Sequence, residues 1–344
     1  MVTIKDVARM AGVSPSTVSK VLNGYTDISP ETKENVLRVV GETRFIPNTS
    51  ARRLVQKKSR TIGFVMHGLE MTNPSDAMQM QLLKGALLCA QSTPYDLVFI
   101  PTTAYIQQER SYDQLCRGNN LAGTILSGLQ NDDRYYQEAG ASSLPCVTID
   151  FSLEGKRGSS VLIDNLEAAR CAVDYLIEQN HREIGLMGGK EKDGKENTAV
   201  GLERYCGYCQ SLIDHGIPLH REYVVHGEFS ESIAYEQAKA LLQRQPQITA
   251  LFCVSDIMAL GVYHAAEELG KRIPEDLSIV AFDDFPLAPY VHPALTTVRQ
   301  HFDSVGSKAV KLLIALIEKD SRMTGPVYST YELILRDSVR RLAR

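Results

Sequence analysis

The first sixty residues constrain the fold most, because they carry two short helical signals separated by a tight turn. Thr3 can cap a first helix, and Asp6 follows at the spacing of a capping box. The segment Ala11–Val13 contains a glycine and predicts a turn, after which Ser14 and Pro15 can begin a second helix. This layout predicts a helix-turn-helix motif, whose second helix lies in the major groove of DNA.

Charge divides sharply along the chain. Residues 1–60 hold eleven Lys or Arg against five Asp or Glu, a net charge of +6, whereas the remainder holds 26 against 36, a net charge of −10. A basic segment attracts the phosphates of nucleic acid and makes affinity depend on salt. The acidic remainder is therefore expected to bind something other than nucleic acid.

Several other classes of protein are disfavoured. No run of about 18 apolar residues is present, which argues against a membrane span. The charged start lacks a secretory apolar segment, so the cytoplasm is the expected location, and seven scattered cysteines fit reduced thiols. Cys206 and Cys209 form a C-x-x-C motif inside a predicted helix, without a second pair. We therefore predict no metal site and no cofactor.

Beyond the headpiece, strands alternate with helices. A third helix is predicted from Ser29 to about Glu42, and a linker covers 57–60. The alternation predicts two doubly wound parallel sheets, the second opening at 161–163, with a ligand cleft beyond the carboxyl ends of their strands. Predicted strands cover 62–66, 97–100, 123–126, 146–149, 161–163, 184–187, 223–225, 250–253, 278–282 and 331–335, and predicted helices include 74–90, a helix ending near 117, 167–179, 199–213, 230–243 and 257–269.

An ordered series of short motifs resembles the lactose/galactose repressor (LacI/GalR) family over essentially all of residues 2–341. The resemblance implies a small all-α helix-turn-helix headpiece, a hinge helix and an α/β bilobed body like periplasmic sugar-binding proteins. The motifs that carry it are Ile4–Ala8, Ala11–Ser14, Thr17–Asn23, Phe45–Asn48, Asp164–Asn165, Asp256–Gly261, Phe282–Asp284 and Pro293–Val298.

The resemblance also implies boundaries for each part. The headpiece covers 1–46, the hinge helix and linker cover 47–60, and the effector-binding and dimerisation domain covers 61–344. Within that domain, we expect one subdomain at about 61–161 and 300–327, and the other at about 162–299 and 328–344.

For DNA binding, the family varies its base contacts at the start of the second helix. We expect Ser16 and Lys20 to carry specificity, because lysine can donate to N7 and O6 of guanine. Pro15 either only begins the helix or offers an apolar contact to a thymine methyl group. Phosphate contacts are expected from Thr17, Ser19 and Asn23.

The segment 48–56 resembles the family's hinge helix, which is too short to be stable alone in water. Leu54 matches the leucine that wedges into the minor groove, and Ala51 allows two hinge helices to approach closely. Arg52 can add phosphate attraction. We expect the helix to form when it pairs with its twin on DNA.

For the effector, the resemblance implies hydroxyl contacts by Arg204, Asp150 and Asp283, and aromatic walls at Phe229 and Phe302. Acceptors, a fork of donors and stacking walls suit a polyhydroxyl ligand. An ion pair of Arg204 with Asp283 that has only a structural role is the alternative. Further expected contacts are His67, Met71, Gln300 and Ser255, the last replacing an asparagine frequent in sugar-responsive members. Asn180 replaces a helix-ending glycine, a change that asparagine tolerates.

Together these features predict a DNA-binding transcriptional regulator, a repressor of carbohydrate-utilisation genes whose operator affinity is controlled by a sugar-like effector. The expected partners are a pseudopalindromic double-stranded operator and a second copy of the chain, paired through the helix at 74–90. No leucine heptad follows 331–335, so we expect a dimer rather than a tetramer linked by such a tail. Whether the effector induces or co-represses is left open by the sequence.

Three other functions are weighed. A regulator whose co-effector is a phosphorylated carrier protein would bind no small molecule. A transport receptor would need an export signal and no basic headpiece. A sugar-modifying enzyme could use Asp150, Asp283, His67 and His301 for acid–base chemistry, but the family resemblance gives that no support.

Overall fold

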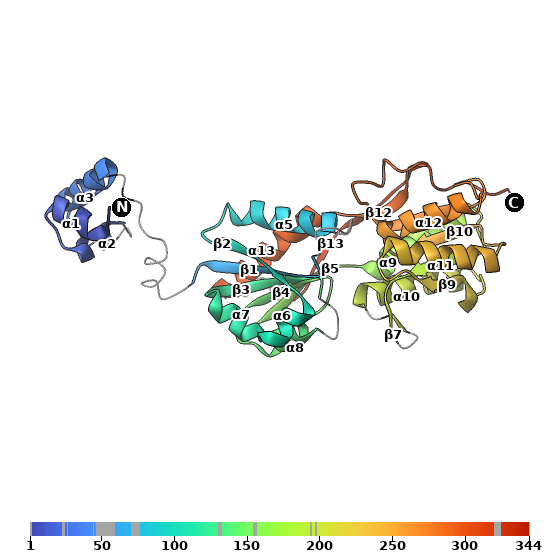
Figure 1. Ribbon diagram of the computed structural model, residues 1–344, viewed down its shortest axis with the longest axis horizontal. Helices are drawn as coiled ribbons and strands as arrows, with labels where there is room; N and C mark the ends of the chain where they lie inside the picture. The colour runs from blue at the N-terminus through green and yellow to red at the C-terminus, as the bar shows by residue number, and fades with distance from the viewer. Residues whose placement is uncertain are drawn as a thin grey trace. The chain divides into compact units, whose positions relative to one another are not determined.

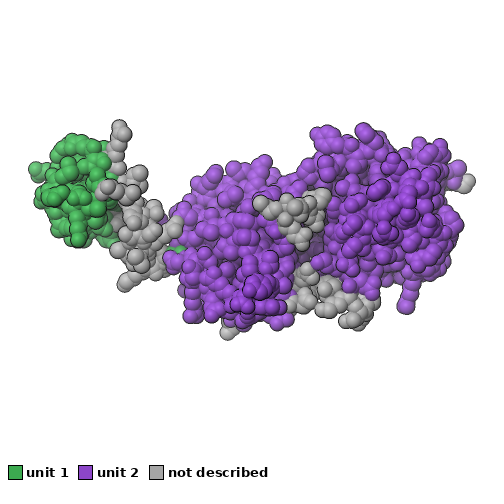
Figure 2. Space-filling model, in the orientation of Figure 1, with its two compact units in different colours: residues 1–59 green, residues 60–344 purple. Residues whose placement is uncertain are grey.

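The computed structural model describes residues 2–22, 25, 27–43, 45, 59–69, 76–129, 133–153, 157–192, 195–196, 198–319 and 325–343. The chain forms two compact units, Met1–Ser59 and Arg60–Arg344, which are coloured separately in Figure 2. Each unit is built around its own hydrophobic core.

The first unit contains the predicted helix-turn-helix motif. Its helices are α1 (Ile4–Ala11), α2 (Pro15–Leu22) and α3 (Pro30–Thr43). The capping box is present, since Thr3 and Asp6 each bond the other's backbone N–H. Gly12 takes the left-handed conformation that ends α1, with φ at 68°. A core that includes Val7, Val18, Val21, Val36 and Val39 holds the three helices together.

The second unit begins with a parallel six-stranded sheet. Its strand order is β13-β5-β4-β3-β1-β2. Alternate residues of the strands face two separate clusters, so helices cover both faces (Figure 1). The strands are β1 (Thr61–His67), β2 (Asp96–Thr102), β3 (Leu121–Ser127), β4 (Cys146–Ile149), β5 (Gly158–Ile163) and β13 (Val327–Ser329). One face of the sheet is covered by α5 (Asp76–Ala90) and α13 (Phe302–Glu318). The other face is covered by α6 (Ala104–Glu109), α7 (Tyr112–Gly118) and α8 (Arg134–Ala141).

A second sheet follows, in the order β14-β12-β11-β10-β6-β9. It is parallel except for the edge strand β14, which is antiparallel to β12. Its strands are β6 (Ile184–Gly188), β9 (Val224–His226), β10 (Ala250–Cys253), β11 (Ser278–Asp283), β12 (Thr296–Gln300) and β14 (Tyr331–Ile334). The helices of this lobe are α9 (Asn165–Glu178), α10 (Ala199–Asp214), α11 (Glu231–Arg244) and α12 (Asp256–Glu268). The short strands β7 (Glu191–Lys192) and β8 (Lys195–Glu196) pair with each other.

The two sheets confirm the predicted bilobed α/β fold, but several elements differ from the sequence interpretation. The strand at 161–163 belongs to the first sheet, because β5 pairs with β4 and β13. The helix expected to end near Arg117 is two helices, separated where Ser111 caps α7. The pattern also missed α8, β12, α13 and β13. The chain therefore passes between lobes after β5, after β12 and after β13.

Glycines allow three helix pairs of the body to pack very closely. A Cβ atom at Gly85 of α5 would overlap the carbonyl oxygen of Asp303 in α13, and one at Gly306 of α13 would overlap that of Leu82 in α5. Gly207 of α10 and Gly261 of α12 have the same relation to α9 and α11. The helix backbones are therefore in direct contact at these positions.

We expect Gly85→Ala to destabilise the body by about 3 kcal/mol, the upper end of the usual cost of overpacking, since a clash with backbone cannot be relieved by a rotamer change. Chemical unfolding followed by circular dichroism measures this loss. Gly41→Ala in α3 is the control, because nothing lies within 4 Å of its Cβ position. The control should be neutral or stabilising, as expected for glycine replaced within a helix. Equal stability of both variants would contradict this account of the packing.

Candidate functional site

A cavity of about 520 Å³ is lined by residues from both lobes. His67 ends β1 and Asp150 follows β4 in the first lobe, while Asp283 and Gln300 end β11 and β12 in the second. The carboxyl ends of parallel strands therefore face this cavity, as the topology predicts. Of the expected effector-binding residues, the cavity brings together His67, Asp150, Arg204, Phe229, Ser255, Asp283 and Gln300.

Two expected effector residues are not in this set. Phe302 is the first residue of α13, and its ring is buried in the core of the first lobe with 4% of its surface exposed. Because Phe302 follows the cavity strand β12 in sequence, it was predicted to form an aromatic wall of the cavity. By residue 302, however, the chain has returned to the first lobe. Met71 lies outside the described residues.

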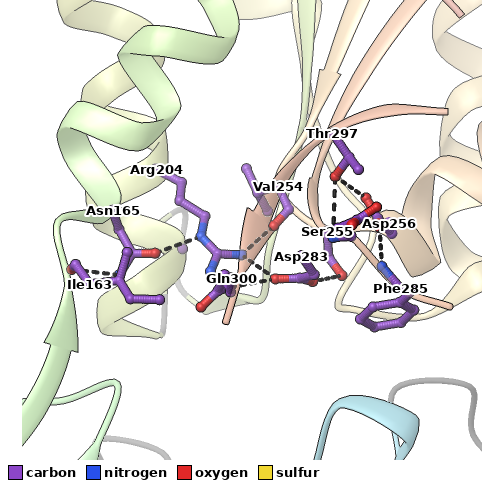
Figure 3. Close-up of polar contacts among 12 residues, drawn as sticks. Ile163, Asn165, Arg204, Val254, Ser255, Asp256, Asp283, Phe285, Thr297 and Gln300 are labelled. Carbon is purple, nitrogen blue, oxygen red and sulfur yellow. Dashed lines mark hydrogen bonds and ion pairs between the residues drawn. The ribbon is translucent and has the colours of Figure 1, made fainter. Parts of the chain in front are cut away.

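Arg204 is the central cation of the cavity, and it is 4% exposed. Its Nε donates to Asn165 Oδ1 at 2.9 Å, and its Nη1 donates to the carbonyl of Val254 at 2.6 Å (Figure 3). The guanidinium lies over the ring of Phe282, 3.6 Å from its centroid. Among the described residues, Nε and Nη1 make these bonds, and Nη2 takes no part in them.

Asp283 pairs with Arg204, at 3.4 Å between Oδ1 and Nη1. The carboxylate also accepts from Ser255 Oγ and Gln300 Nε2, both at 2.7 Å (Figure 3). Its φ of 119° is unusual for a residue with a side chain and marks a backbone held by its surroundings. Arg204 and Asp283 therefore form an ion pair in the fold. Ser255 uses its hydroxyl to orient Asp283.

Asp256 supports the segment that follows β11. The sequence interpretation had assigned this residue no role. It accepts from the backbone N–H of Phe285 at 2.7 Å and from Thr297 Oγ1 at 2.5 Å. Burial raises its pKa well above the usual range, and Asp283 adds to the effect. The motif Asp256–Gly261 contained the signal, but only the fold reveals the partners of its first residue.

His67 is held from behind by a buried glutamine. The backbone N–H of Tyr135 donates to Gln107 Oε1 at 3.0 Å, so the amide nitrogen of Gln107 faces His67 Nδ1 at 2.9 Å. An amide nitrogen can only donate, so Nδ1 accepts in this contact, and Asp133 Oδ1 lies 3.6 Å from the same ring nitrogen. Gln107 therefore fixes the orientation of the His67 ring. Sequence analysis missed Gln107, since nothing local distinguishes it from Gln108.

Asp150 has a left-handed backbone, with φ at 69°, and its amide donates to the carbonyl of Val161. Burial raises its pKa to about 6, because the attraction of Arg204 only partly offsets the loss of water and Asp283 repels the charge. The ionisation of this carboxyl group therefore changes close to neutral pH.

The headpiece exposes the expected base-reading positions. Pro15, Ser16 and Lys20 are exposed on α2, while Thr17 and Ser19 are half-buried. Ser14 caps the helix by accepting from the N–H of Thr17 at 3.1 Å. Lys20 Nζ forms an ion pair at 2.6 Å with Asp27, which sequence analysis did not single out. The remaining expected DNA contacts, Asn23, Ala51, Arg52 and Leu54, lie outside the described residues.

The C-x-x-C motif lies within a helix, as predicted, since Cys206 and Cys209 both belong to α10. Lys190, before β7, is a further residue that lines the cavity. In the part of the chain that the structure describes, no cluster of three or more His, Cys, Asp or Glu residues could hold a metal ion. Nor does any described helix have the length and apolar character needed to cross a membrane.

Comparison with known proteins identifies the class. Residues 3–48 match the family described as bacterial regulatory proteins, lacI family, and residues 173–339 match the periplasmic binding protein-like domain. The transcriptional regulator MalR of Clostridium butyricum is 33% identical over 97% of this chain and 98% of its own length. The ribose operon repressor of Haemophilus influenzae is 30% identical, with 98% and 99% covered.

Solved structures agree. The lac repressor dimer bound to operator and an anti-inducer has a TM-score of 0.82 at 25% identity, with 98% of this chain and 99% of that chain covered. The complex of the regulator CelR with cellobiose has a TM-score of 0.74 at 27% identity, with 98% and 100% covered. The chain is a DNA-binding transcriptional regulator. It belongs to the lacI family of bacterial regulatory proteins.

The raised pKa of Asp150 predicts a pH-dependent stability. The folded protein holds this proton more tightly than the unfolded chain, so the carboxyl costs stability as pH rises from about 4 through about 6. Asp150→Asn should therefore raise the melting temperature by a few degrees at pH 7.5, and the gain should vanish near pH 4. Thermal unfolding across this range measures it.

Asp113→Asn is the matched control, because that carboxylate is exposed and pairs with an exposed arginine. It should change the melting temperature little at either pH. A loss of stability in Asp150→Asn at pH 7.5 would show that the ionised carboxylate is favourable in the fold.

Proposed function

We propose that this regulator is a repressor of carbohydrate-utilisation genes, and that a sugar-like effector bound between the lobes controls its affinity for its operator. The observation that supports this best is the convergence of Arg204, Asp150, Asp283 and His67 on one cavity beside the aromatic ring of Phe229. Fixed donors and acceptors next to an apolar surface suit the hydroxyl groups and the apolar face of a sugar ring. A relative named as a ribose operon repressor, and a related regulator solved in complex with cellobiose, support the same class.

The charges around the cavity favour a neutral sugar over a phosphorylated or uronic one. The carboxylates of Asp150, Glu228 and Asp283 line it, against the cations of Lys190 and Arg204. Arg204 is already compensated by Asp283, so a second anion would face an excess of negative charge. A cavity of about 520 Å³ is large enough for a disaccharide, since drug-sized ligands occupy about 300–1,000 Å³.

The proposed control is a shift between two arrangements of the lobes. Three chain crossings join them, so a ligand that contacts both lobes changes how they close. Operator affinity changes only as far as the ligand binds one arrangement more tightly than the other. Because the target is chromosomal DNA, we expect the protein to act in the cytoplasm.

On the DNA side, we propose that Ser16 and Lys20 read bases and that Pro15 offers an apolar contact. Thr17, Ser19 and Asn23 are proposed phosphate contacts. Ala51, Arg52 and Leu54 are proposed to act in a hinge helix at the minor groove, which forms when two copies meet on a pseudopalindromic operator. A headpiece at 1–46 and a hinge at 47–60 fit this division of roles.

The second copy is proposed to pack on α5. One face of this helix is buried against α13 through Gly85, while Met80, Leu87 and Leu88 are 40%, 40% and 58% exposed. A row of exposed apolar side chains on a rigid helix is the kind of surface that association covers.

Leu88→Glu should therefore prevent dimerisation, because a carboxylate would be buried in the interface. Sedimentation equilibrium should give a monomer for this variant and a dimer for the parent protein. Leu219→Glu, at an exposed leucine of the second lobe, should remain dimeric. A dimer in both variants would exclude α5 as the interface, and a stable tetramer of the parent protein would contradict the proposed assembly.

The effector is tested by a thermal-shift screen of the full-length protein against neutral mono- and disaccharides, uronates, sugar phosphates and purines. A saturating ligand at about 100 times its Kd adds about 2.7 kcal/mol, or roughly 5–10 °C in melting temperature for lobes of this size. We expect the shift from a neutral sugar, and the sugar should be recovered unchanged because we propose binding without turnover.

Arg204→Lys keeps a cation beside Asp283 but removes the fork of donors, so it should lose the shift and still fold. Arg117→Lys, at an exposed arginine, should keep it. Absence of any shift across the panel would overturn the sugar effector and favour a protein co-effector.

A further inference from the structure

The headpiece carries a negative charge beside its recognition helix, where phosphate groups make a carboxylate unfavourable. Lys20 is the basic residue of α2, and its Nζ lies 2.6 Å from Asp27 Oδ2. Both side chains are about half exposed, at 46% and 55%. An exposed ion pair of this kind adds little to stability, so stability alone gives little reason for it.

The pair lies on the outward face of the helix. Val18 and Val21 of α2 are buried in the headpiece core, whereas Ser16 and Lys20 are exposed and one turn apart. Asp27 comes from the loop before α3, and its bond to Lys20 brings the carboxylate beside this face. Hydrogen bonding to Lys20 lowers the pKa of Asp27, so the carboxylate is ionised at neutral pH.

We propose that Lys20 and Asp27 act as one unit that reads a G·C base pair, with Asp27 as a specificity-determining residue. This inference rests on the proposed base-reading role of Lys20. An ammonium group has three donors. One is engaged by Asp27, and the other two match O6 and N7 of a single guanine. The carboxylate can in turn accept from N4 of cytosine, a contact that carboxylates make in the major groove.

The same pairing reduces non-specific binding. Asp27 neutralises the charge of Lys20, so the ammonium group gains less from a phosphate than a free lysine would. On a mixed sequence the carboxylate of the pair faces phosphates and base acceptors, and no amino group of cytosine donates to it. Asp27 thus weakens binding to the wrong sequence and strengthens binding to the right one, which widens the ratio between the two.

The experiment uses the full-length protein, a duplex library with a randomised centre, and one fixed duplex of mixed sequence. The parent protein first selects its preferred sequence from the library. Affinities for the selected and the mixed duplex are then measured across a range of salt. Asp27→Asn keeps the shape of the side chain but removes its charge, and Glu34→Gln removes one exposed negative charge of α3 as the control.

For Asp27→Asn we expect binding to the selected duplex to weaken by roughly 5- to 100-fold, the effect of losing one base-specific contact. Binding to the mixed duplex should tighten, and its dependence on salt should steepen by about one phosphate contact. A library selected by this variant should lose its preference at one G·C pair in each half-site. Glu34→Gln should leave the ratio of the two affinities and the selected sequence unchanged.

Equal changes on both duplexes, or the same change in Glu34→Gln, would overturn the inference and leave only a general charge effect. Lys20→Ala separates this failure from failure of the proposed Lys20 role. If Lys20→Ala leaves the selected sequence unaltered, the base-reading role of Lys20 is wrong. If Lys20→Ala relaxes one position and Asp27→Asn does not, Lys20 reads the base alone. Circular dichroism of each variant checks that the headpiece remains folded.

Discussion

The cavity depends on one buried cation. Removing the Arg204 guanidinium from water is costly, and the protein offsets this with the carbonyl of Val254, the amide of Asn165, the carboxylate of Asp283 and the ring of Phe282. Val254 directly follows β10, Asn165 begins α9, and Phe282 and Asp283 end β11. The contacts that compensate the charge of Arg204 therefore fix the ends of these elements against α10. The same contacts thus set the shape of the cavity.

A second layer of buried carboxylates extends this constraint. Asp256 holds the N–H of Phe285 and the hydroxyl of Thr297, while Asp283 ends β11 in a conformation rarely adopted by residues with a side chain. Two residues that face the cavity are thus positioned by neighbouring side chains: Ser255 and Gln300 hold Asp283, and Gln107 holds His67. Preorganised groups of this kind recognise a ligand without first paying for their own ordering.

Features of the fold that depend on residues close together in sequence could be predicted, and features that depend on distant contacts could not. Thr3, Asp6 and Pro15 act within one helical turn, so the headpiece helices could be found from sequence. Asn180 was expected to tolerate a left-handed conformation at a helix end, and its φ is 70°. The sheet to which 161–163 belongs could not be found this way, because a buried parallel strand looks alike in either lobe.

The site was predicted with a similar division. Residues at the carboxyl ends of strands, such as Asp150 and Asp283, could be inferred because the topology brings strand ends together. Their partners could not, since Gln107 and Asn165 meet them only through tertiary packing. The prediction that Phe302 lines the cavity was wrong for a related reason. The chain crosses from the second lobe to the first between Gln300 and Phe302, so closeness in sequence to Gln300 did not place Phe302 in the cavity.

The close helix packing links the cavity with the apolar face of α5. Met78 and Gln79 of this helix line the cavity, while Met80 and Leu88 are exposed on its other side. Because α5 contacts α13 backbone to backbone at Gly85, the helix cannot shift by rotating side chains. A ligand that displaced Met78 or Gln79 would therefore move α5 and α13 together. The exposed apolar face of α5, with Met80 and Leu88, would move with them. Any control by a bound molecule would then act through rigid-body displacement of this helix pair, not through local rearrangement.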